Sequence, residues 1–217
     1  MGRRPAAERR EELVALYREA RSCTRCPLWQ SRTQVVFGNG NADADLMFVG
    51  EAPGFHEDQQ GLPFVGRAGQ LLDDLLAGIG LTRGDVFVAN VLKSRPPGNR
   101  DPQPDEIDAC KPYLYKQVEL IEPKVVCTLG NFATKLLTRS NRGIRSVHGR
   151  AQIHELGGRR VRIYPLCHPA AALRTPAVKA ELQEDFSRLP ELLAEPALDE
   201  PAPEPVAVAP PQMDLFR

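Results

Sequence analysis

The segment Asp45-Leu-Met-Phe-Val-Gly-Glu-Ala-Pro-Gly54 joins a short apolar run to a turn that contains two glycines. A short apolar run that a glycine ends is typical of a buried strand, so we expect a strand over residues 45–49. Three later runs have the same character and predict further strands. They lie at residues 85–89, 124–129 and 160–166.

Helical patterns separate these strands. Residues 5–21 place apolar side chains at helical spacing opposite a charged face, and four later segments also favour helices. These later helices are expected at residues 67–79, at 105–120 despite Pro112, from Gly130 onward, and at 176–193. Strands that alternate with helices indicate an α/β protein whose parallel sheet is covered on both faces. Ligands of such sheets bind at the carboxyl ends of the strands.

Charge and composition restrict the possible partners. The 217 residues have a formal net charge of zero, but residues 194–217 hold five acidic side chains and one basic one. Residues 1–193 are therefore mildly basic, with four excess positive charges, which permits a local DNA-binding patch without requiring one. No stretch approaches about 20 apolar residues, and the charged N-terminus lacks a secretory signal, so we expect a cytoplasmic protein.

A first pair of motifs follows the strand at 45–49. Gly50-Glu-Ala-Pro-Gly54 and Gly61-Leu-Pro-Phe-Val-Gly66 are glycine-containing turns that let the backbone approach a flat ligand closely. Phe64 offers an aromatic face on which a base can stack. An ordinary strand-to-helix loop with a core phenylalanine is the alternative interpretation.

Two polar side chains follow later strands. Asn90 is both a donor and an acceptor, so its amide can bind O4 and N3–H of uracil while cytosine presents the reverse pattern. His168 opens His168-Pro-Ala-Ala-Ala-Leu-Arg174 and can stabilise negative charge on a leaving group. Leu173 and Arg174 suit a wedge into a DNA groove and a phosphate contact. A turn-capping asparagine and a plain His–Pro loop are the alternatives.

Five cysteines, an odd number, argue against a disulfide framework in a cytoplasmic protein. Four of them are candidate thiolate ligands for zinc or for an iron–sulfur cluster: Cys23, Cys26, Cys110 and Cys127. Cys23-x₂-Cys26 alone also suits a redox dithiol. Cys110 and Cys127 could instead be buried core residues, and this applies most to Cys127, which lies inside an apolar strand.

These motifs together, with the run VANVLKSRPPGNRDP between residues 88 and 102, resemble family 4 uracil-DNA glycosylases over residues 10–190. The resemblance implies a three-layer α/β/α sandwich with a central four-stranded parallel sheet. It also implies a DNA repair enzyme that flips uracil into a pocket and hydrolyses its N-glycosidic bond. A 4Fe–4S cluster on the four cysteines would then attach the N-terminal segment to the sheet.

The resemblance also assigns roles to residues. Phe64 would stack on the uracil, Asn90 would read its polar edge, and His168 would hold O2 as the bond breaks. Gly50 would form part of the uracil site, Glu51 and Ala52 would border the sugar, and the Ala52 backbone would also contact uracil. Glu57 would block a thymine methyl group. DNA contacts would come from Leu173, Arg174 and Arg95.

Two departures from related enzymes narrow the expected mechanism. Uracil glycosylases of the first family carry an aspartate that positions water, whereas the matching residue here is Ala52. We therefore expect a dissociative reaction in which His168 stabilises the leaving uracilate and Glu51 orients the water or stabilises the cation. A related group forms a covalent adduct through a histidine in an inserted basic loop. The loop Lys93-Ser-Arg-Pro-Pro-Gly-Asn-Arg100 has no histidine and no insertion, so we expect turnover.

The C-terminal part differs from the glycosylase domain, which we place at residues 1–193. Residues 194–211 contain six prolines with alanines and acids, which predicts a disordered linker. Residues 212–217 then resemble the peptide by which bacterial repair proteins bind the sliding clamp, with Gln212, Leu215 and Phe216 as its anchors. We expect a monomer near the nucleoid. A non-enzymatic iron–sulfur module that binds nucleic acid, or a glycosylase of broader deaminated-base specificity, are the alternatives.

Overall fold

One six-stranded sheet forms the centre of the computed structural model, which describes residues 4–198. Its order is β1-β3-β2-β4-β6-β5. The four central strands are parallel: β3 (Phe87–Asn90), β2 (Leu46–Gly50), β4 (Val125–Leu129) and β6 (Arg159–Leu166). These are the four strands expected from the sequence, so the expected α/β class and parallel sheet are confirmed.

Two edge strands extend this sheet antiparallel to their neighbours. They are β1 (Asn39–Gly40), which pairs with β3, and β5 (Gln152–Leu156), which pairs with β6. Neither was expected, because β1 has two exposed residues and β5 is apolar on only part of its length. Gly157 and Gly158 connect β5 to β6 with positive φ values of 60° and 71°, which suits a two-residue hairpin turn.

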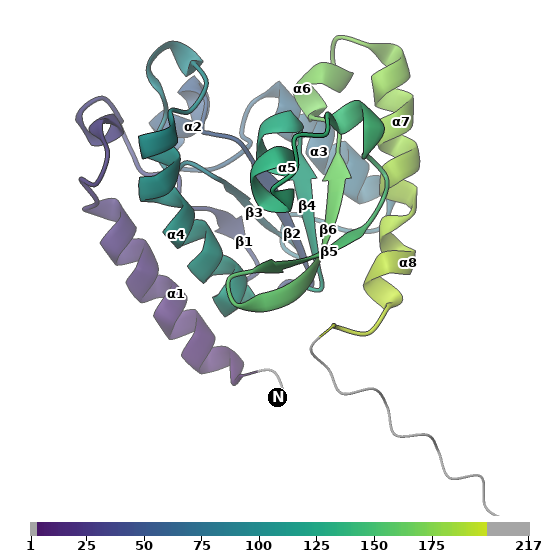
Figure 1. Cartoon of the computed structure of the whole chain (residues 1–217), viewed down its shortest axis with the longest axis horizontal. Helices are drawn as coiled ribbons and strands as arrows, with labels where there is room; N and C mark the ends of the chain where they lie inside the picture. Colours follow the sequence, from purple (N-terminus) through teal and green to yellow (C-terminus); the bar gives the residue numbers. More distant parts are fainter. Residues whose placement is uncertain (1–3, 199–217) are drawn as a thin grey trace, which may run out of the picture.

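Helices cover both faces of the sheet and make the molecule three layers thick (Figure 1). One face carries α1 (Ala6–Arg21), α4 (Pro104–Ile121) and α5 (Asn131–Thr138), while the other carries α3 (Arg67–Gly78), α7 (Pro176–Ser187) and α8 (Leu189–Ala194). Alternate residues of each central strand pack into the two hydrophobic cores, one on each face of the sheet. In β2, Met47 and Val49 face the α1–α4–α5 side, whereas Leu46 and Phe48 face the other.

The expected helix at 176–193 is divided into α7 and α8 at Arg188. Pro190, the second residue of α8, has no N–H to continue the hydrogen bonds of the preceding helix. The helix over Pro112 continues without a break. Two short helices were not expected. They are α2 (Phe55–Gln60), which directly follows the Gly50–Gly54 motif, and α6 (Pro169–Ala172), which lies inside the His168–Arg174 motif.

The carboxyl ends of the parallel strands bring the motifs to one edge. Gly50, the last residue of β2, pairs in register with Asn90, the last residue of β3, and His168 follows β6 by two residues. No helix among residues 4–198 is both long and apolar enough to pass through a membrane. The expected linker at 194–211 is described only as far as residue 198: Ala194 ends α8, and Arg162 binds Glu195 and the Pro196 carbonyl, both at 2.8 Å. The rest of the linker and the expected clamp motif at 212–217 lie outside the described residues.

Candidate active site

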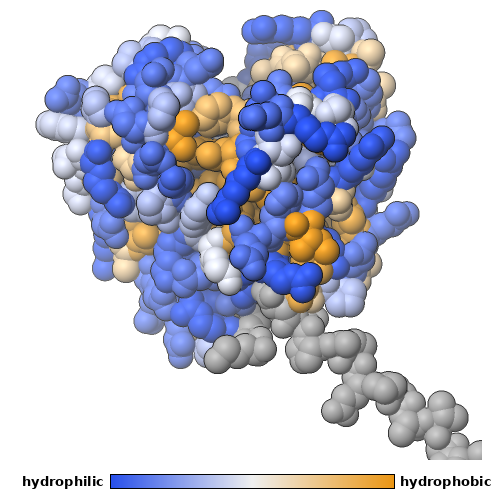
Figure 2. Space-filling view, in the orientation of Figure 1, coloured by the Kyte–Doolittle hydropathy of each residue, from blue (hydrophilic) through white to orange (hydrophobic). Residues whose placement is uncertain are grey.

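A pocket of about 470 Å³ lies at this carboxyl edge. In the space-filling view the molecule is notched along the same edge (Figure 2). The lining residues come from all three motif segments. They are Glu51, Ala52, Pro53, Gly54, Glu57, Phe64, Ala68, Asn90, Pro96, Asn99, Arg100, His168 and Ala170. The structure therefore brings together the expected base-stacking, amide and imidazole groups.

Gly50 allows two of these groups to meet. A Cβ at this position would lie 2.4 Å from Asn90 Oδ1 and 2.8 Å from Phe64 Cζ, both far inside contact distance. Only a residue without a side chain fits between the amide and the aromatic ring. Gly50 thus lets the two side chains meet through the space it leaves, although it does not itself line the pocket.

Asn90 is 2% exposed, yet its side-chain amide makes no hydrogen bond to another residue in the part of the chain that the structure describes. Its amide is not among the fully enclosed polar atoms that lack a partner in the described chain, and Asn90 lines the pocket. The amide is therefore available to hydrogen-bond a ligand in the pocket. Lys93 fixes the backbone beneath it. Its buried Nζ donates to the Asn90 carbonyl and to Gln117 Oε1, both at 2.7 Å.

Phe64 adopts the left-handed backbone conformation, with φ at 55°, which is strained for an aromatic residue. Arg83 Nη2 donates to the Phe64 carbonyl at 2.9 Å and holds it in place. Gly69 is required beneath the same carbonyl, because a Cβ there would lie 1.7 Å from the Phe64 oxygen. The left-handed backbone conformation, kept in place by these contacts, therefore fixes the Phe64 ring at the pocket wall.

Glu57 lines the pocket and also anchors the Phe64 loop. Its Oε1 accepts hydrogen bonds from the backbone N–H groups of Val65 at 3.0 Å and Gly66 at 3.2 Å. The sequence suggested a steric role for Glu57 against thymine. The hydrogen bonds to Val65 and Gly66 add a second role, in which Glu57 positions the loop that carries Phe64.

The hydrogen bonds of His168 define its tautomer. The Ala170 backbone N–H donates to Nδ1 at 3.1 Å, so Nδ1 is an acceptor and the neutral ring carries its proton on Nε2. Burial lowers the pKa of this imidazole, which favours the neutral form. Gly130, at the end of β4, packs against the ring's Cβ, and any side chain there would crowd it. His168 thus offers an Nε2–H donor to the pocket.

Glu51 and Ala52 follow β2 and both line the pocket. Burial raises the pKa of the Glu51 carboxyl above its usual value, and the charge of Asp101 adds to this shift. The Glu51 backbone carbonyl accepts a hydrogen bond from Leu92 N–H at 3.0 Å, which attaches this turn to the segment after β3. Ala52 contributes no acid or base, so Glu51 is the carboxylate next to the expected sugar position.

The residues expected to contact DNA lie near the same edge. Leu173 directly follows α6 and is 40% exposed, and Arg174 is the next residue in the chain. Arg95 belongs to the loop after β3, where its Nε donates to Asn99 Oδ1 at 2.7 Å. Since Asn99 lines the pocket, Arg95 is positioned at the pocket rim.

Three of the four cysteines lie on one face of the sheet. Cys110 belongs to the core on the α1–α4–α5 side, and Cys23 and Cys26 pack against that core. Cys26 and Cys110 lie beside each other, while Cys23 lies beside Tyr113 and Arg25. Among residues 4–198, no group of three or more His, Cys, Asp or Glu side chains is arranged to hold a metal ion.

Cys127 lies on the opposite face. It is fully buried in β4 among Phe48 and Tyr164, in the core that α3 and α7 cover, because alternate strand residues point to opposite sides. The sheet separates its thiol from the other three. The expected four-cysteine ligand set therefore does not fit this structure, and the assignment of Cys127 is corrected to a core residue.

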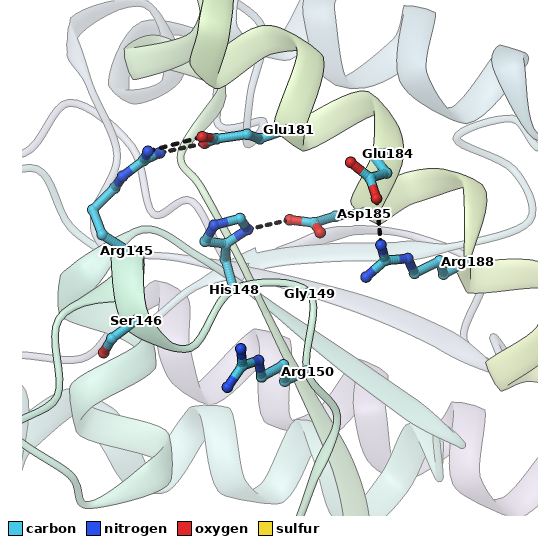
Figure 3. Close-up of a pocket in the computed structure, with 9 residues that line it drawn as sticks. All are labelled: Arg145, Ser146, His148, Gly149, Arg150, Glu181, Glu184, Asp185 and Arg188. Atoms are coloured by element: carbon cyan, nitrogen blue, oxygen red, sulfur yellow. Dashed lines mark hydrogen bonds and ion pairs between the residues drawn. The ribbon is translucent and has the colours of Figure 1, made fainter.

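A second pocket, of about 230 Å³, lies beside α7 and contains a His148–Asp185 pair 2.7 Å apart (Figure 3). Four of its other charged groups pair as Arg145–Glu181 and Arg188–Glu184, and Arg150 also lines the pocket. Ser146 Oγ donates to the Gly143 carbonyl, and its side chain points away from His148. Within the described chain, no serine hydroxyl of this pocket therefore meets the histidine, and the His148–Asp185 and Arg145–Glu181 pairs attach the loop at residues 144–150 to α7.

The fold and the first pocket define a class: an α/β protein with a parallel central sheet, whose carboxyl edge brings an aromatic face, an amide and an imidazole to one pocket. The sequence profile described as "Uracil DNA glycosylase superfamily" matches residues 37–189. The chain belongs to this superfamily, and its similarity to curated relatives places it in the type-4 family.

Three relatives illustrate this similarity. The type-4 uracil-DNA glycosylase of Sulfurisphaera tokodaii is 44% identical over 86% of this chain and 87% of the relative. That of Archaeoglobus fulgidus is 45% identical, covering 84% and 94%. The bacterial enzyme of Thermotoga maritima is 46% identical, covering 76% and 85%.

Proposed function

We propose that this protein removes uracil from DNA by hydrolysing its N-glycosidic bond, leaving an abasic site and free uracil. The observation that carries the proposal is the Asn90 side chain, which is 2% exposed and shares a pocket with Phe64 and His168. Its amide makes no hydrogen bond to another residue in the described chain and can therefore bind a ligand. A base can reach this pocket only after it leaves the DNA helix.

Recognition follows from the chemistry of the pocket walls. Phe64 presents its ring to the face of the base, and the Asn90 amide donates to O4 and accepts from N3–H. Cytosine has an amino group at position 4 and no proton on N3, so it would set donor against donor and acceptor against acceptor. A mismatch at a buried amide can reduce the reaction by on the order of 10⁴-fold.

His168 stabilises the leaving group. As the bond between C1′ and N1 breaks, its electron pair moves to the uracil ring and negative charge grows on O2. The neutral imidazole presents Nε2–H to that oxygen, while the Ala170 N–H keeps the other nitrogen unprotonated. A donor already oriented toward developing charge lowers the barrier because it needs little reorganisation.

Water completes the reaction at C1′. With Ala52 in place of an acid, the cation forms before water attacks, and the water's hydroxyl bonds to C1′ while its proton passes to uracilate or solvent. Glu51 stabilises the cation or orients this water from the sugar side of the pocket. The product is released, so no denaturation-resistant protein–DNA adduct should accumulate.

One incubation tests the proposal. The full chain is mixed with single- and double-stranded oligonucleotides that carry one uracil, and alkali then cleaves any abasic site. Strands with thymine or hypoxanthine measure specificity, and Asn90→Ala is the matched variant. Strand cleavage at uracil alone supports the proposal. DNA binding without cleavage at any base would instead indicate a non-enzymatic nucleic-acid-binding module.

The cysteines support a separate proposal for an iron–sulfur cluster. Cys23, Cys26 and Cys110 would supply three thiolates, and the buried hydroxyl of Ser94 would stand at the fourth position. Ser94 follows Lys93, whose backbone contacts the Cys110 thiol, and Arg32 Nη1 donates to Ser94 Oγ at 3.3 Å. Bound there, the cluster would link the segment after α1 to α4.

The C-terminal segment supports a partner proposal from sequence alone. Gln212, Leu215 and Phe216 would bind a bacterial sliding clamp at the end of a linker, which raises the local concentration of enzyme at replicating DNA. Removal of residues 212–217 should abolish clamp binding and leave activity on short duplexes unchanged. Retained clamp binding would refute this proposal.

A further inference from the structure

A pair of side chains at the pocket rim has no role in the mechanism above. Phe55 is the first residue of α2 and follows Gly54, which lines the pocket, yet its side chain is 51% exposed. Arg95, from the loop after β3, places its guanidinium carbon 5.1 Å from the centre of the Phe55 ring. The pair therefore joins the two loops that border one side of the pocket.

Arg95 is held in this position. Its Nε donates to Asn99 Oδ1 at 2.7 Å, and Asn99 lines the pocket together with Pro96. The two terminal nitrogens of Arg95 make no hydrogen bond within residues 4–198. The guanidinium can thus contact Phe55 and still donate to an incoming phosphate.

We propose that Phe55 and Arg95 form a second binding site, which stacks the base next to the flipped uracil when the substrate is single-stranded. This inference rests on the proposed function. An exposed aromatic ring beside a cation suits a nucleobase, since every base has a face that can stack. In a duplex the neighbouring base is already stacked and paired, whereas in a single strand it is free to bind.

The first test measures stacking without turnover. A single-stranded oligonucleotide carries a 2′-fluoro-deoxyuridine, which resists cleavage, with fluorescent 2-aminopurine on its 5′ side or, in a second strand, its 3′ side. The wild-type chain should quench 2-aminopurine in at least one of the two strands. Phe55→Ala and Phe55→Leu should both lose this quenching and bind about tenfold more weakly, while Phe55→Trp should keep it.

The second test separates binding from chemistry. Phe55→Ala should raise KM for a uracil-containing single strand about tenfold, leave kcat within about twofold, and change KM for the duplex much less. Ile153→Ala, which shortens another exposed apolar side chain on β5, is the control and should change neither constant.

Three results would overturn the inference. One is unchanged quenching by the Phe55→Ala variant. Another is wild-type quenching and binding by Phe55→Leu, because the aromatic ring would then contribute nothing. Equal KM changes on single strands and duplexes would instead make Phe55 a duplex wedge. If the chain released no uracil at all, the proposed function would fail, yet the fluorescence test would still decide whether Phe55 stacks a base.

Discussion

The ring of Phe64 faces the ring of His168, with their centroids 5.8 Å apart and their planes inclined by 27°. The group that would stack on the base thus also supports the group that would stabilise the leaving oxygen. Phe64→Leu should therefore raise KM about tenfold through lost stacking and also lower kcat. Phe64→Tyr, which keeps the ring, should stay near wild type in steady-state assays. A change in KM alone for Phe64→Leu would show that the two rings act independently.

The His168 and Glu51 side chains should contribute unequally to the reaction rate. His168→Ala removes the donor to O2 and should lower kcat by about a hundredfold to a thousandfold. Glu51→Gln keeps the shape of the side chain and should retain measurable activity, about tenfold below wild type, because bond breaking precedes water attack. Single-turnover rates with excess enzyme measure both. An equal collapse of the two variants would contradict a dissociative mechanism.

The rate of uracil release should fall at low pH because two groups in the pocket become protonated. Burial holds the His168 pKa below its usual 6.5, so the imidazole stays neutral near pH 7 and protonates only at lower pH, where Nδ1 can no longer accept from Ala170. Burial raises the Glu51 pKa above its usual 4.5, so this carboxylate also becomes protonated as the pH falls. A profile of kcat/KM against pH should be steeper in wild type than in Glu51→Gln. Identical acid limbs would remove Glu51 from the reaction.

Gly50→Ala should impair the pocket more than the fold. Its methyl group would press on Asn90 Oδ1 and Phe64 Cζ, which should cost about 1–3 kcal/mol of stability and lower kcat/KM by at least about a hundredfold. Gly78→Ala is the matched control, since its Cβ meets nothing within 4 Å, and it should change stability by less than about 1 kcal/mol. Thermal unfolding and uracil release measure the two effects. An active Gly50→Ala variant would mean that the pocket walls can separate.

The cysteine assignment predicts unequal effects on iron content. Cys26→Ser and Cys110→Ser should lose iron and visible absorbance, whereas Cys127→Ser should keep both, because Cys127 lies across the sheet. Ser94→Cys should make the cluster more resistant to oxidative loss by supplying a fourth thiolate. Anaerobic purification followed by iron and sulfide analysis checks each variant. Loss of iron in Cys127→Ser, or stoichiometric zinc in colourless protein, would refute the assignment.

The sequence predicts the four central strands because each is a continuous apolar run, and it predicts the place of Asn90 and His168 because each follows such a run. It does not predict the second role of Glu57 or the role of Lys93, since both depend on hydrogen bonds that only the folded chain creates. Lys93 lies inside the VANVLKSRPP run, and a lysine directly after the apolar residues Val91 and Leu92 was the available signal. The side of the sheet on which Cys127 lies follows from the alternation of side chains along β4, and the spacing between the cysteines in the sequence does not indicate it.

The left-handed backbone of Phe64 has a consequence for attempts to re-engineer this pocket toward another base. The ring's position is set by Arg83, which binds the Phe64 carbonyl, and by Gly69, which leaves room for it, and neither lines the pocket. A library that randomises only the lining residues would vary the walls around a fixed ring. Changes in base selectivity that require the ring to tilt would have to be selected at positions 69 and 83, which the substrate never touches.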